Sequence, residues 1–192
     1  LDGRGLGAYF DALIEGPTTA QLIAQGWLSP YTFYAPSKAN LSGVHRVAGD
    51  YNKHELADAM ESSSVVGDAL AHYRQHCANG RALVFAWSLD ASRRIAEQFV
   101  AAGIAAQHVD GETPRQERQQ TMKEFRDGSV RVLCNCELFG EGLDVPGVDA
   151  VFLLRPTQSL GLYLQQVGRG LRVADRKTTV RIFDHASNYE RH

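Results

Sequence analysis

The sequence predicts an α/β protein with a three-layer αβα architecture, in which a mostly parallel sheet lies between two layers of helices. A helical and irregular connecting segment precedes it. From Arg81 onward, short apolar strands alternate with helices of about ten residues or more, a pattern typical of right-handed crossovers in a parallel sheet with helices on both faces. The chain has 192 residues, of which 44% are hydrophobic and 22% charged. Such a chain is long enough and apolar enough to bury one good-sized core.

The front part of the chain reads as helices, one strand and irregular structure. Apolar residues at helical spacing predict a helix over Leu6–Ile14, and Thr18 is expected to cap a second helix that runs to Gln25. The elements expected after it are an aromatic strand over Tyr31–Ala35, a polar irregular stretch over Pro36–Gly49, a helix from the cap Asn52 to Met60, and a longer helix over Val65–Cys77. This part contains no pattern that carries chemistry by itself.

The second part supplies the alternating strands and helices. Thr113 is expected to cap a helix that has Pro114 at its first position. The expected strands are Ala82–Trp87, Ala105–Val109, Val130–Asn135, Ala150–Leu154 and Thr179–Phe183, and the expected helices are Ala91–Ala102, Pro114–Arg126 and Ser159–Val167. In open parallel sheets, ligands bind at the carboxyl ends of the strands. We therefore expect the unusual residues that follow these strands, and the segment Gln165–Arg172 one helix farther on, to gather along one edge of the sheet.

The segment Gln165–Arg172, which we call the arginine octet, is the feature around which the chain is organised. Arg169 and Arg172 stand three residues apart beside two glycines, after the helical run Ser159–Val167. Arginine is permanently charged and matches phosphate oxygens bidentately, and glycine lets a large anion approach the backbone. A basic, solvated helix end would show the same residues, because arginine also complements the helix dipole. We expect both guanidinium groups to point outward from the fold.

A Gly-rich loop and two strand ends add candidate sites. In the loop Gly140–Pro146, Gly142 permits close approach to a ligand and Asp144 offers a carboxylate to a ribose hydroxyl or a water, although an ordinary turn would also have this composition. The amide of Gly111 and the following helix start could hold a backbone phosphate, or the helix could simply be well capped. Ser88, after its strand, could contact phosphate or cap the next helix.

Composition limits the function classes. The formal net charge is −2, so any surface that binds nucleic acid must come from a local patch. Three cysteines without repeated CxxC spacing argue against a disulfide framework and a structural zinc, and indicate reduced thiols in a cytoplasmic protein. No apolar stretch approaches the ~20 residues of a membrane span. Because the chain begins with Leu1, we expect it to be a piece of a longer protein.

In combination, these motifs resemble the C-terminal RecA-like motor lobe of superfamily-two DEAD/DEAH-box helicases. Leu83–Ser88 resembles motif IV, Asp110–Gly128 the segment after it, Val132–Pro146 motif V, and the arginine octet the Q-x-x-G-R-x-x-R form of motif VI. The similarity is greatest to bacterial and phage helicases akin to the type III restriction subunit. It covers residues 81–184, and Leu1–Gly7 is similar to the stretch after the first lobe's Thr/Ser-Ala-Thr motif.

The resemblance implies a remnant of the inter-lobe connection over residues 1–30 and the C-terminal lobe over 31–192. ATP and Mg²⁺ would bind in the full-length protein, with the magnesium ligands on the N-terminal lobe, because this chain has neither Gly-x-x-x-x-Gly-Lys-Ser/Thr nor an Asp-Glu strand end. The implied roles are arginine fingers for Arg169 and Arg172, ATP contacts for Gly142, Asp144, Gln165 and Gly168, and strand contacts for Ser88, Gly111 and Cys136. The fragment alone is expected to be inactive.

Departures from the family pattern refine these expectations. Cys136 stands where relatives commonly carry Thr or Ser, and Gln165-Gln166 replaces the His-Arg pair of the DEAD-box branch that acts on RNA. The expected partners are therefore the N-terminal lobe and nucleic acid, DNA more than RNA, with restriction–modification or phage proteins as further candidates and no membrane. Two alternatives remain: a non-catalytic module that binds DNA or a partner protein, and a nucleotide-binding enzyme of another doubly wound kind, which lacks support because no Gly-x-Gly-x-x-Gly follows a first strand.

Overall fold

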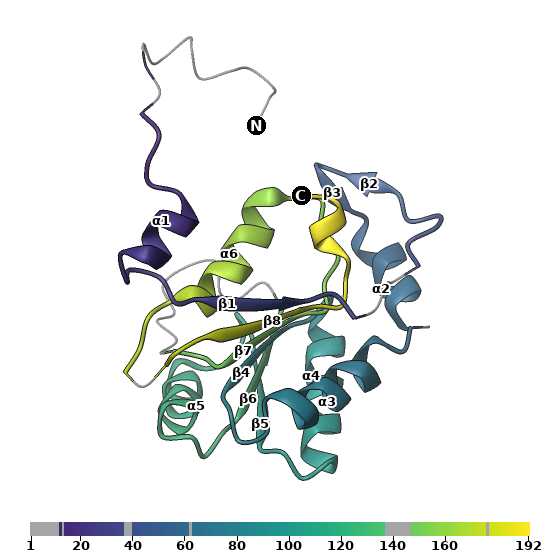
Figure 1. Ribbon diagram of the computed structural model, residues 1–192. Helices are drawn as coiled ribbons and strands as arrows, with labels where there is room; N and C mark the ends of the chain where they lie inside the picture. The colour runs from purple at the N-terminus through teal and green to yellow at the C-terminus, as the bar shows by residue number, and fades with distance from the viewer. Residues whose placement is uncertain (1–11, 13, 37–39, 62, 137–146, 176) are drawn as a thin grey trace.

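The protein is built around one six-stranded sheet whose strands all run parallel (Figure 1). The computed structural model describes residues 12, 14–36, 40–61, 63–136, 147–175 and 177–192. The sheet order is β1-β8-β7-β4-β6-β5. The strands are β1 (Tyr31–Tyr34), β4 (Ala82–Phe85), β5 (Ala106–Val109), β6 (Val132–Asn135), β7 (Ala150–Leu153) and β8 (Val180–Asp184).

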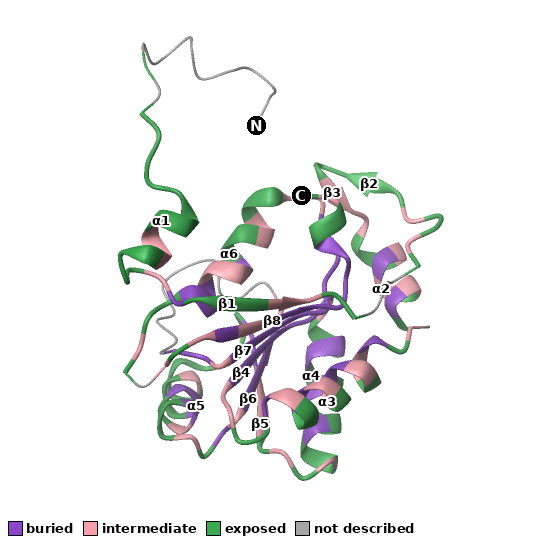
Figure 2. Cartoon of the chain, in the orientation of Figure 1, coloured by how far each residue is buried: buried purple, intermediate pink, exposed green. Residues whose placement is uncertain are grey.

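Helices cover both faces of the sheet, which confirms the predicted αβα layers. The helices are α1 (Thr19–Ala24), α2 (Lys53–Glu61), α3 (Val65–His76), α4 (Leu89–Ala101), α5 (Arg115–Asp127) and α6 (Leu160–Leu171). Apolar side chains of α2, α3 and α4 form one core with alternate strand residues such as Val84 and Phe152. The intervening residues, such as Leu83 and Val151, form the second core with α5 and α6. The central strands are therefore buried on both sides (Figure 2).

The carboxyl ends of five strands lie level with one another. Phe85 is opposite both Asn135 and Leu153, Val109 is opposite Asn135, and Leu153 is opposite Asp184. Neighbouring strands in a sheet lie about 4.8 Å apart. The residues that follow β5, β6, β4, β7 and β8 therefore form one row across the top of the sheet, which we call the carboxyl edge.

Most predicted elements are confirmed, with boundaries shifted by a few residues. Thr18 caps α1 through a capping box with Gln21, and Asn52 Oδ1 accepts from the first-turn amides of α2. The stretch expected to be irregular over Pro36–Gly49 contains strand β2 (Arg46–Val47), which pairs with β3 (Asp50–Tyr51) in an antiparallel hairpin. The helix predicted over Leu6–Ile14 falls almost entirely outside the described residues. Among the described helices, none combines the length and apolarity needed to cross a bilayer.

Candidate nucleotide-facing and strand-facing surfaces

The first seven residues of the arginine octet lie inside α6, and Arg172 follows as its C-cap, so the octet does not come after a shorter helix. Ser159 begins the helix as its N-cap, with its Oγ accepting from the Leu162 amide at 3.3 Å, and the helix continues to Leu171. The helical run therefore extends past the predicted end at Val167, because neither Gly168 nor Gly170 interrupts it. Arg172 is the C-cap residue, with φ −59° and ψ 133°. Arg169 therefore projects from the last turn of a helix and Arg172 from its end.

The C-terminal end of the arginine octet does not lie at the carboxyl edge, which corrects the predicted convergence. The amide of Ser29, just before β1, donates to the Leu171 carbonyl at 2.8 Å, and Leu28 forms an antiparallel bridge with Arg172. These contacts place Arg172 beside the amino ends of the strands. The reason is that a crossover helix runs antiparallel to the strands it connects, and twelve helical residues rise about 18 Å.

The two glycines of the arginine octet face different surroundings. A Cβ atom built on Gly170 would lie 2.7 Å from Val151 Cγ2 and 3.3 Å from Val180 Cγ2, so this glycine lets α6 approach the sheet closely. A Cβ on Gly168 would meet nothing within 4 Å. Gln165 and Arg172, which are both exposed, flank Gly168 at helical spacing. The surface formed by Gln165, Gly168 and Arg172, which we call the open face of α6, therefore points away from the sheet.

The two arginines differ in exposure, which corrects half of the prediction. Arg172 is exposed as expected, whereas Arg169 retains only 9% of its accessible surface. Residue 169 precedes Gly170 by one position, or about 100° around the helix, so its side chain leaves the helix beside the surface that contacts the sheet. Arg172 is therefore the more accessible of the two arginines.

Two residues outside the arginine octet hold the backbone at the end of α6, where carbonyl groups have no partner within the helix. Lys177 Nζ donates to the carbonyl oxygens of Gly170 and Arg172, the latter at 2.8 Å. Ser29 Oγ donates to the same Arg172 carbonyl oxygen at 3.2 Å. Sequence reasoning missed both residues. A lysine a few residues past a helix end is a recognised cap for such carbonyls, but the contact of Ser29 joins residues that are 143 positions apart.

Burial changes the acid–base character of Lys177. The pKa of the ammonium group is lowered to about 8, chiefly by burial, with Asp149 opposing the shift and Arg81 adding to it. The lysine therefore remains cationic near neutral pH while its Nζ lies against the helix end, where a positive charge is favourable.

Ser88 occupies the carboxyl edge after β4, as predicted. Its Oγ accepts from the Ala91 amide at 3.1 Å, which makes it the N-cap of α4. The capping interpretation of Ser88 is thus confirmed. The same hydroxyl retains its proton for donation to a phosphate oxygen.

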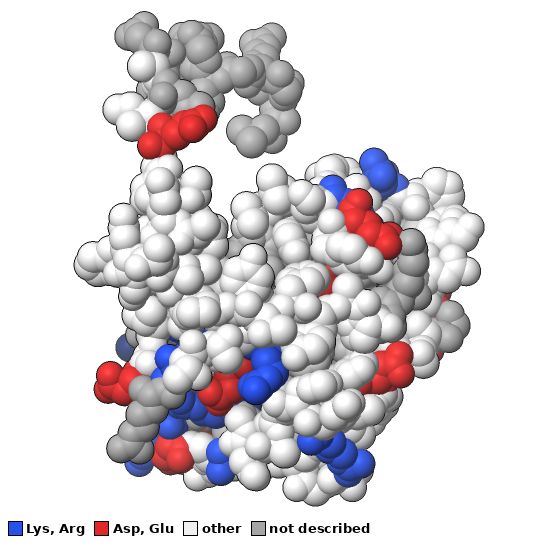
Figure 3. All heavy atoms as spheres, in the orientation of Figure 1, with Lys and Arg blue, Asp and Glu red and all other residues white. Residues whose placement is uncertain are grey.

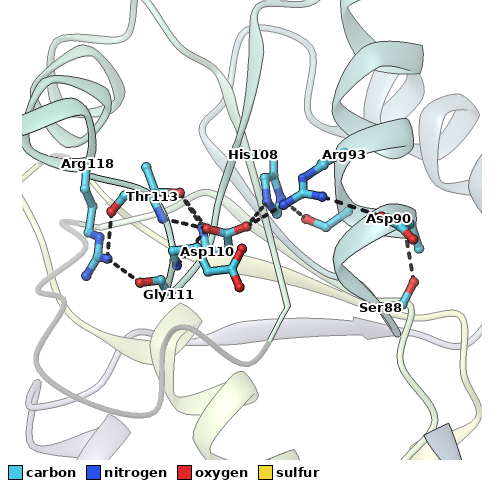
Figure 4. A network of polar contacts seen from close by, with 11 residues as sticks. Ser88, Asp90, Arg93, His108, Asp110, Gly111, Thr113 and Arg118 are labelled. Atoms are coloured by element: carbon cyan, nitrogen blue, oxygen red, sulfur yellow. Dashed lines mark hydrogen bonds and ion pairs between the residues drawn. The ribbon is translucent and has the colours of Figure 1, made fainter. Parts of the chain in front are cut away.

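A network around Asp110 shapes the carboxyl edge after β5 (Figure 4). Asp110 is buried, and its Oδ2 lies 2.9 Å from His108 Nε2 and 3.0 Å from an Arg93 nitrogen. The other oxygen, Oδ1, accepts from the amides of Glu112 and Thr113 at 3.0 and 2.7 Å. The hydrogen bonds from His108 and Thr113 hold the pKa of Asp110 well below its usual range, although burial opposes the shift. An ionised carboxylate therefore ties β5, α4 and the following loop together.

The start of α5 differs from the prediction, because the Thr113 hydroxyl is used by Asp110. This hydroxyl donates to Asp110 Oδ1 at 2.8 Å and accepts from the Asp110 amide at 2.9 Å. Pro114 takes the N-cap position and provides no side-chain cap. Arg118 closes the loop by donating to the carbonyl oxygens of Gly111 and Thr113 at 3.2 and 3.0 Å.

Gly111 is exposed at the tip of this loop, and a Cβ built on it would meet nothing within 4 Å. Its backbone also does not adopt a positive φ. Neither packing nor backbone conformation within the described residues therefore requires glycine at this position. The absence of a side chain leaves room for another molecule to approach the loop.

Cys136 follows β6 at the same edge and is partly exposed, while Cys134 and Cys77 are buried. Burial raises the pKa of the Cys77 thiol to about 11 and that of Cys134 further still.

The predicted ATP contacts Gly142 and Asp144 lie outside the described residues. Across the described ranges, no group of three or more His, Cys, Asp and Glu side chains could hold a metal ion.

Comparison with known proteins identifies the family of this chain. The family model for the helicase conserved C-terminal domain matches residues 65–174. A 51.5 kDa protein of Lactococcus phage (isolate 7-9) is 38% identical over 192 residues, which are all of this chain and 42% of that protein. The putative ATP-dependent helicase IRC3 of Saccharomyces cerevisiae is 30% identical over 187 residues, 95% of this chain and 27% of that protein. This chain thus spans less than half the length of these relatives.

Among solved structures, the ATP-dependent Type ISP restriction–modification enzyme LlaBIII bound to DNA matches with a TM-score of 0.61. The match covers 86% of this chain and 12% of that one at 19% identity, which supports a shared RecA-like fold. Because the family model matches more than half of the sequence, this chain belongs to the helicase conserved C-terminal domain family, and it corresponds to the C-terminal RecA-like lobe of superfamily-two relatives.

Proposed function

We propose that this lobe works in an ATP-dependent DNA helicase or translocase, where it supplies an arginine finger to ATP and part of the strand-binding surface. The observation that carries the proposal is the position of Arg172: its side chain is exposed at the end of the open face of α6, and its backbone carbonyl accepts hydrogen bonds from Lys177 and Ser29. A permanent cation on a fixed backbone can stabilise the transition state of phosphoryl transfer, because negative charge accumulates on the transferred phosphoryl group.

The open face of α6 fits a nucleotide that is also bound by a second lobe. Gly168 leaves the middle of this face without a side chain, and the exposed amide group of Gln165 lies one turn before it. In this proposal Gln165 contacts the nucleotide and Arg172 reaches its γ-phosphate, while Mg²⁺ is held by the N-terminal lobe. Arg169 is the second proposed finger, and its burial makes it the weaker of the two. Gly142 and Asp144 remain proposed ATP contacts.

The carboxyl edge is the proposed strand-binding surface. Ser88, Gly111 and Cys136 follow β4, β5 and β6, which are neighbours in the sheet. A hydroxyl, an open backbone and a thiol would contact phosphate and sugar rather than bases, so binding would show little sequence preference. DNA is favoured over RNA because Gln165-Gln166 replaces the His-Arg pair of the DEAD-box branch that acts on RNA.

The test is ATP hydrolysis by the full-length protein with single- and double-stranded DNA and RNA. We expect Arg172→Ala to lower turnover by roughly 10³-fold or more, while the Kd for ATP measured by a fluorescent analogue stays within a few-fold. Arg74→Ala is the matched control, because Arg74 is an exposed arginine at the C-terminal end of α3 that donates to the Ala102 carbonyl. Turnover by Arg172→Ala within a few-fold of wild type would refute the finger. DNA binding by a wild-type protein that hydrolyses no ATP would instead support a binding module.

A further inference from the structure

The β2–β3 hairpin is a compact, exposed element that the proposed function leaves unused. Arg46 pairs with Tyr51 and Val47 with Asp50, and the two strands are joined by Ala48 and Gly49 with φ of 52° and 87°. Positive φ at both turn residues is the geometry of a tight hairpin turn. The Asn52 amide donates to the His45 carbonyl at 2.9 Å, which extends the pairing by one hydrogen bond.

The hairpin is anchored on the carboxyl edge of the sheet by Asp50. Its Oδ1 accepts from the Gln158 amide at 2.8 Å, and its Oδ2 accepts from Thr157 Oγ at 3.0 Å. Arg155 adds an ion pair to Oδ2 at 3.4 Å. Arg155 and Thr157 are buried and follow β7 directly. The anchor therefore belongs to the same row of strand ends as the proposed strand contacts.

Tyr51, the residue after Asp50 in β3, provides a second anchor for the hairpin. Its hydroxyl accepts from Gln158 Nε2 at 2.6 Å, and the Arg191 guanidinium carbon lies 5.7 Å from the centre of its ring. The hairpin is thus held both by the start of α6 and by the C-terminal segment. In Figure 1 it stands at the upper right of the molecule, beside the C-terminus.

Sheet order places the hairpin at one end of the proposed strand-binding surface. Gly111, Cys136 and Ser88 follow β5, β6 and β4, and β7 is the next strand in the sheet. Because strands are about 4.8 Å apart, the three contacts span roughly 10 Å and the hairpin anchor lies one strand farther on. A nucleic-acid strand that follows this row toward β7 would therefore meet the hairpin.

The outer residues of the hairpin suit a phosphodiester chain. Arg46 is exposed, and Val47 next to it retains 56% of its accessible surface. The neighbouring acids are engaged: Asp50 is in the anchor, and Glu55 accepts from the His45 amide at 2.6 Å and contacts its ring nitrogen at 3.1 Å. Figure 3 shows basic and acidic side chains on this end of the molecule. Arg46 can therefore pair with a phosphate while Val47 offers an apolar contact to sugar or base.

We infer that the β2–β3 hairpin is a further nucleic-acid contact of this lobe, in which Arg46 binds a backbone phosphate at the β7 end of the carboxyl edge. The inference rests on the proposed strand-binding surface, and it extends that surface by one contact beyond Ser88. Asp50 acts as a positioning residue, because it fixes the hairpin to the sheet without facing the bound strand.

The test uses the full-length protein and fluorescein-labelled oligo-dT and oligo-U of increasing length, in a salt titration. We expect Arg46→Ala to weaken binding to strands that reach the hairpin by several-fold and to reduce the salt slope by about 0.7, the value for one phosphate contact on a single strand. Shorter strands should bind as they do to wild type. Asp50→Asn should weaken long-strand binding in the same way, and Arg74→Ala is the control for a lost exposed arginine at the opposite end of the strands.

A second measurement does not depend on affinity. A photoreactive p-benzoylphenylalanine placed at the exposed Val47 position should crosslink to bound strand. An unchanged salt slope in Arg46→Ala, or no crosslink from position 47, would overturn the hairpin contact if Gly111→Ala still weakens binding. If Gly111→Ala and Arg46→Ala both bind every strand like wild type, the strand-binding surface itself is refuted. Comparison of the oligo-dT and oligo-U series separates DNA from RNA.

Discussion

Lys177 Nζ lies 2.8 Å from the backbone carbonyl oxygen of Arg172 and also donates to the carbonyl of Gly170. The lysine thus connects the segment before β8 to the end of α6. It orients the backbone from which the proposed arginine finger projects, although its own side chain is partly buried rather than presented to a ligand.

Removal of this contact should impair turnover without removing the nucleotide site. We expect Lys177→Met in the full-length protein to lower the kcat for ATP by roughly 10- to 100-fold, since small errors in the placement of catalytic groups have effects of this size. The Kd for ATP should change little, and Lys177→Arg should restore part of the rate. Steady-state ATPase kinetics and ATP titration measure both quantities. Lys123→Met, on the exposed surface of α5, is the control, and a folded Lys177→Met protein with wild-type kcat would contradict the positioning role.

The two glycines of the arginine octet should respond oppositely to alanine. Gly170→Ala places a methyl group 2.7 Å from Val151 Cγ2, so we expect a loss of at least about 1 kcal/mol in the free energy of unfolding. Gly168→Ala meets no atom within 4 Å and should raise stability by about 0.5–1 kcal/mol, because alanine favours the helix. Urea unfolding measures both. Equal stabilities for the two variants would show that Gly170 has no packing role.

ATP hydrolysis gives these variants a second readout. If the open face of α6 meets the nucleotide, Gly168→Ala should lower activity despite its greater stability, because the added methyl group lies on that face. Full activity of Gly168→Ala would argue against close approach of ATP to this position.

Gly111→Ala should leave the fold intact and weaken strand binding. Space around the residue is open and its φ is compatible with alanine. A lost backbone contact of about 1 kcal/mol corresponds to roughly five- to tenfold weaker binding. Fluorescence anisotropy with single-stranded DNA measures the affinity, and thermal unfolding measures the stability. Gly16→Ala, where the added Cβ also meets nothing, provides the matched substitution away from the carboxyl edge.

Acid should destabilise the protein through His185, which is fully buried and stacks against the rings of Phe152 and Phe183. The pKa of His185 is lowered from 6.5 to about 4, chiefly by burial and also by nearby His72, with Asp68 opposing the shift. Between these values the unfolded chain binds a proton that the folded chain does not, so stability falls as pH decreases from 6.5 to about 4. The full shift corresponds to a loss of about 3 kcal/mol at most.

Urea unfolding across this pH range tests the prediction. His185→Phe removes the titrating group and keeps a ring in the stack. The free energy of unfolding of the variant should therefore rise relative to that of wild type as the pH falls. The contribution of Asp110 does not interfere, because its pKa is lowered in the fold and its stabilisation is lost below the usual carboxyl range. If the free energies of unfolding of the two proteins differ by a constant amount from pH 7 to 4, His185 is excluded as the cause of the acid destabilisation.

Periodicity and capping residues predicted most of the helices and strands, because these signals are local. Ser88, Asn52 and Thr18 cap the helices assigned to them. The prediction that Thr113 caps α5 was wrong, because its amide and its hydroxyl both donate to the carboxylate of Asp110 instead. Such competition depends on the burial of Asp110 and on its contacts with Arg93 and His108, which come from two other elements.

The sequence by itself determined the parallel αβα architecture, the family motifs and the row formed by Ser88, Cys136 and Gly111, since the carboxyl ends of parallel strands must share an edge. Only the tertiary structure decided that the C-terminal end of the arginine octet lies at the amino ends of the strands, that Arg169 is buried while Arg172 is exposed, and that Lys177 and Ser29 hold the end of α6. These features depend on how a helix is rotated against the sheet and on contacts between residues far apart in the chain, and neither leaves a periodic signal in the sequence.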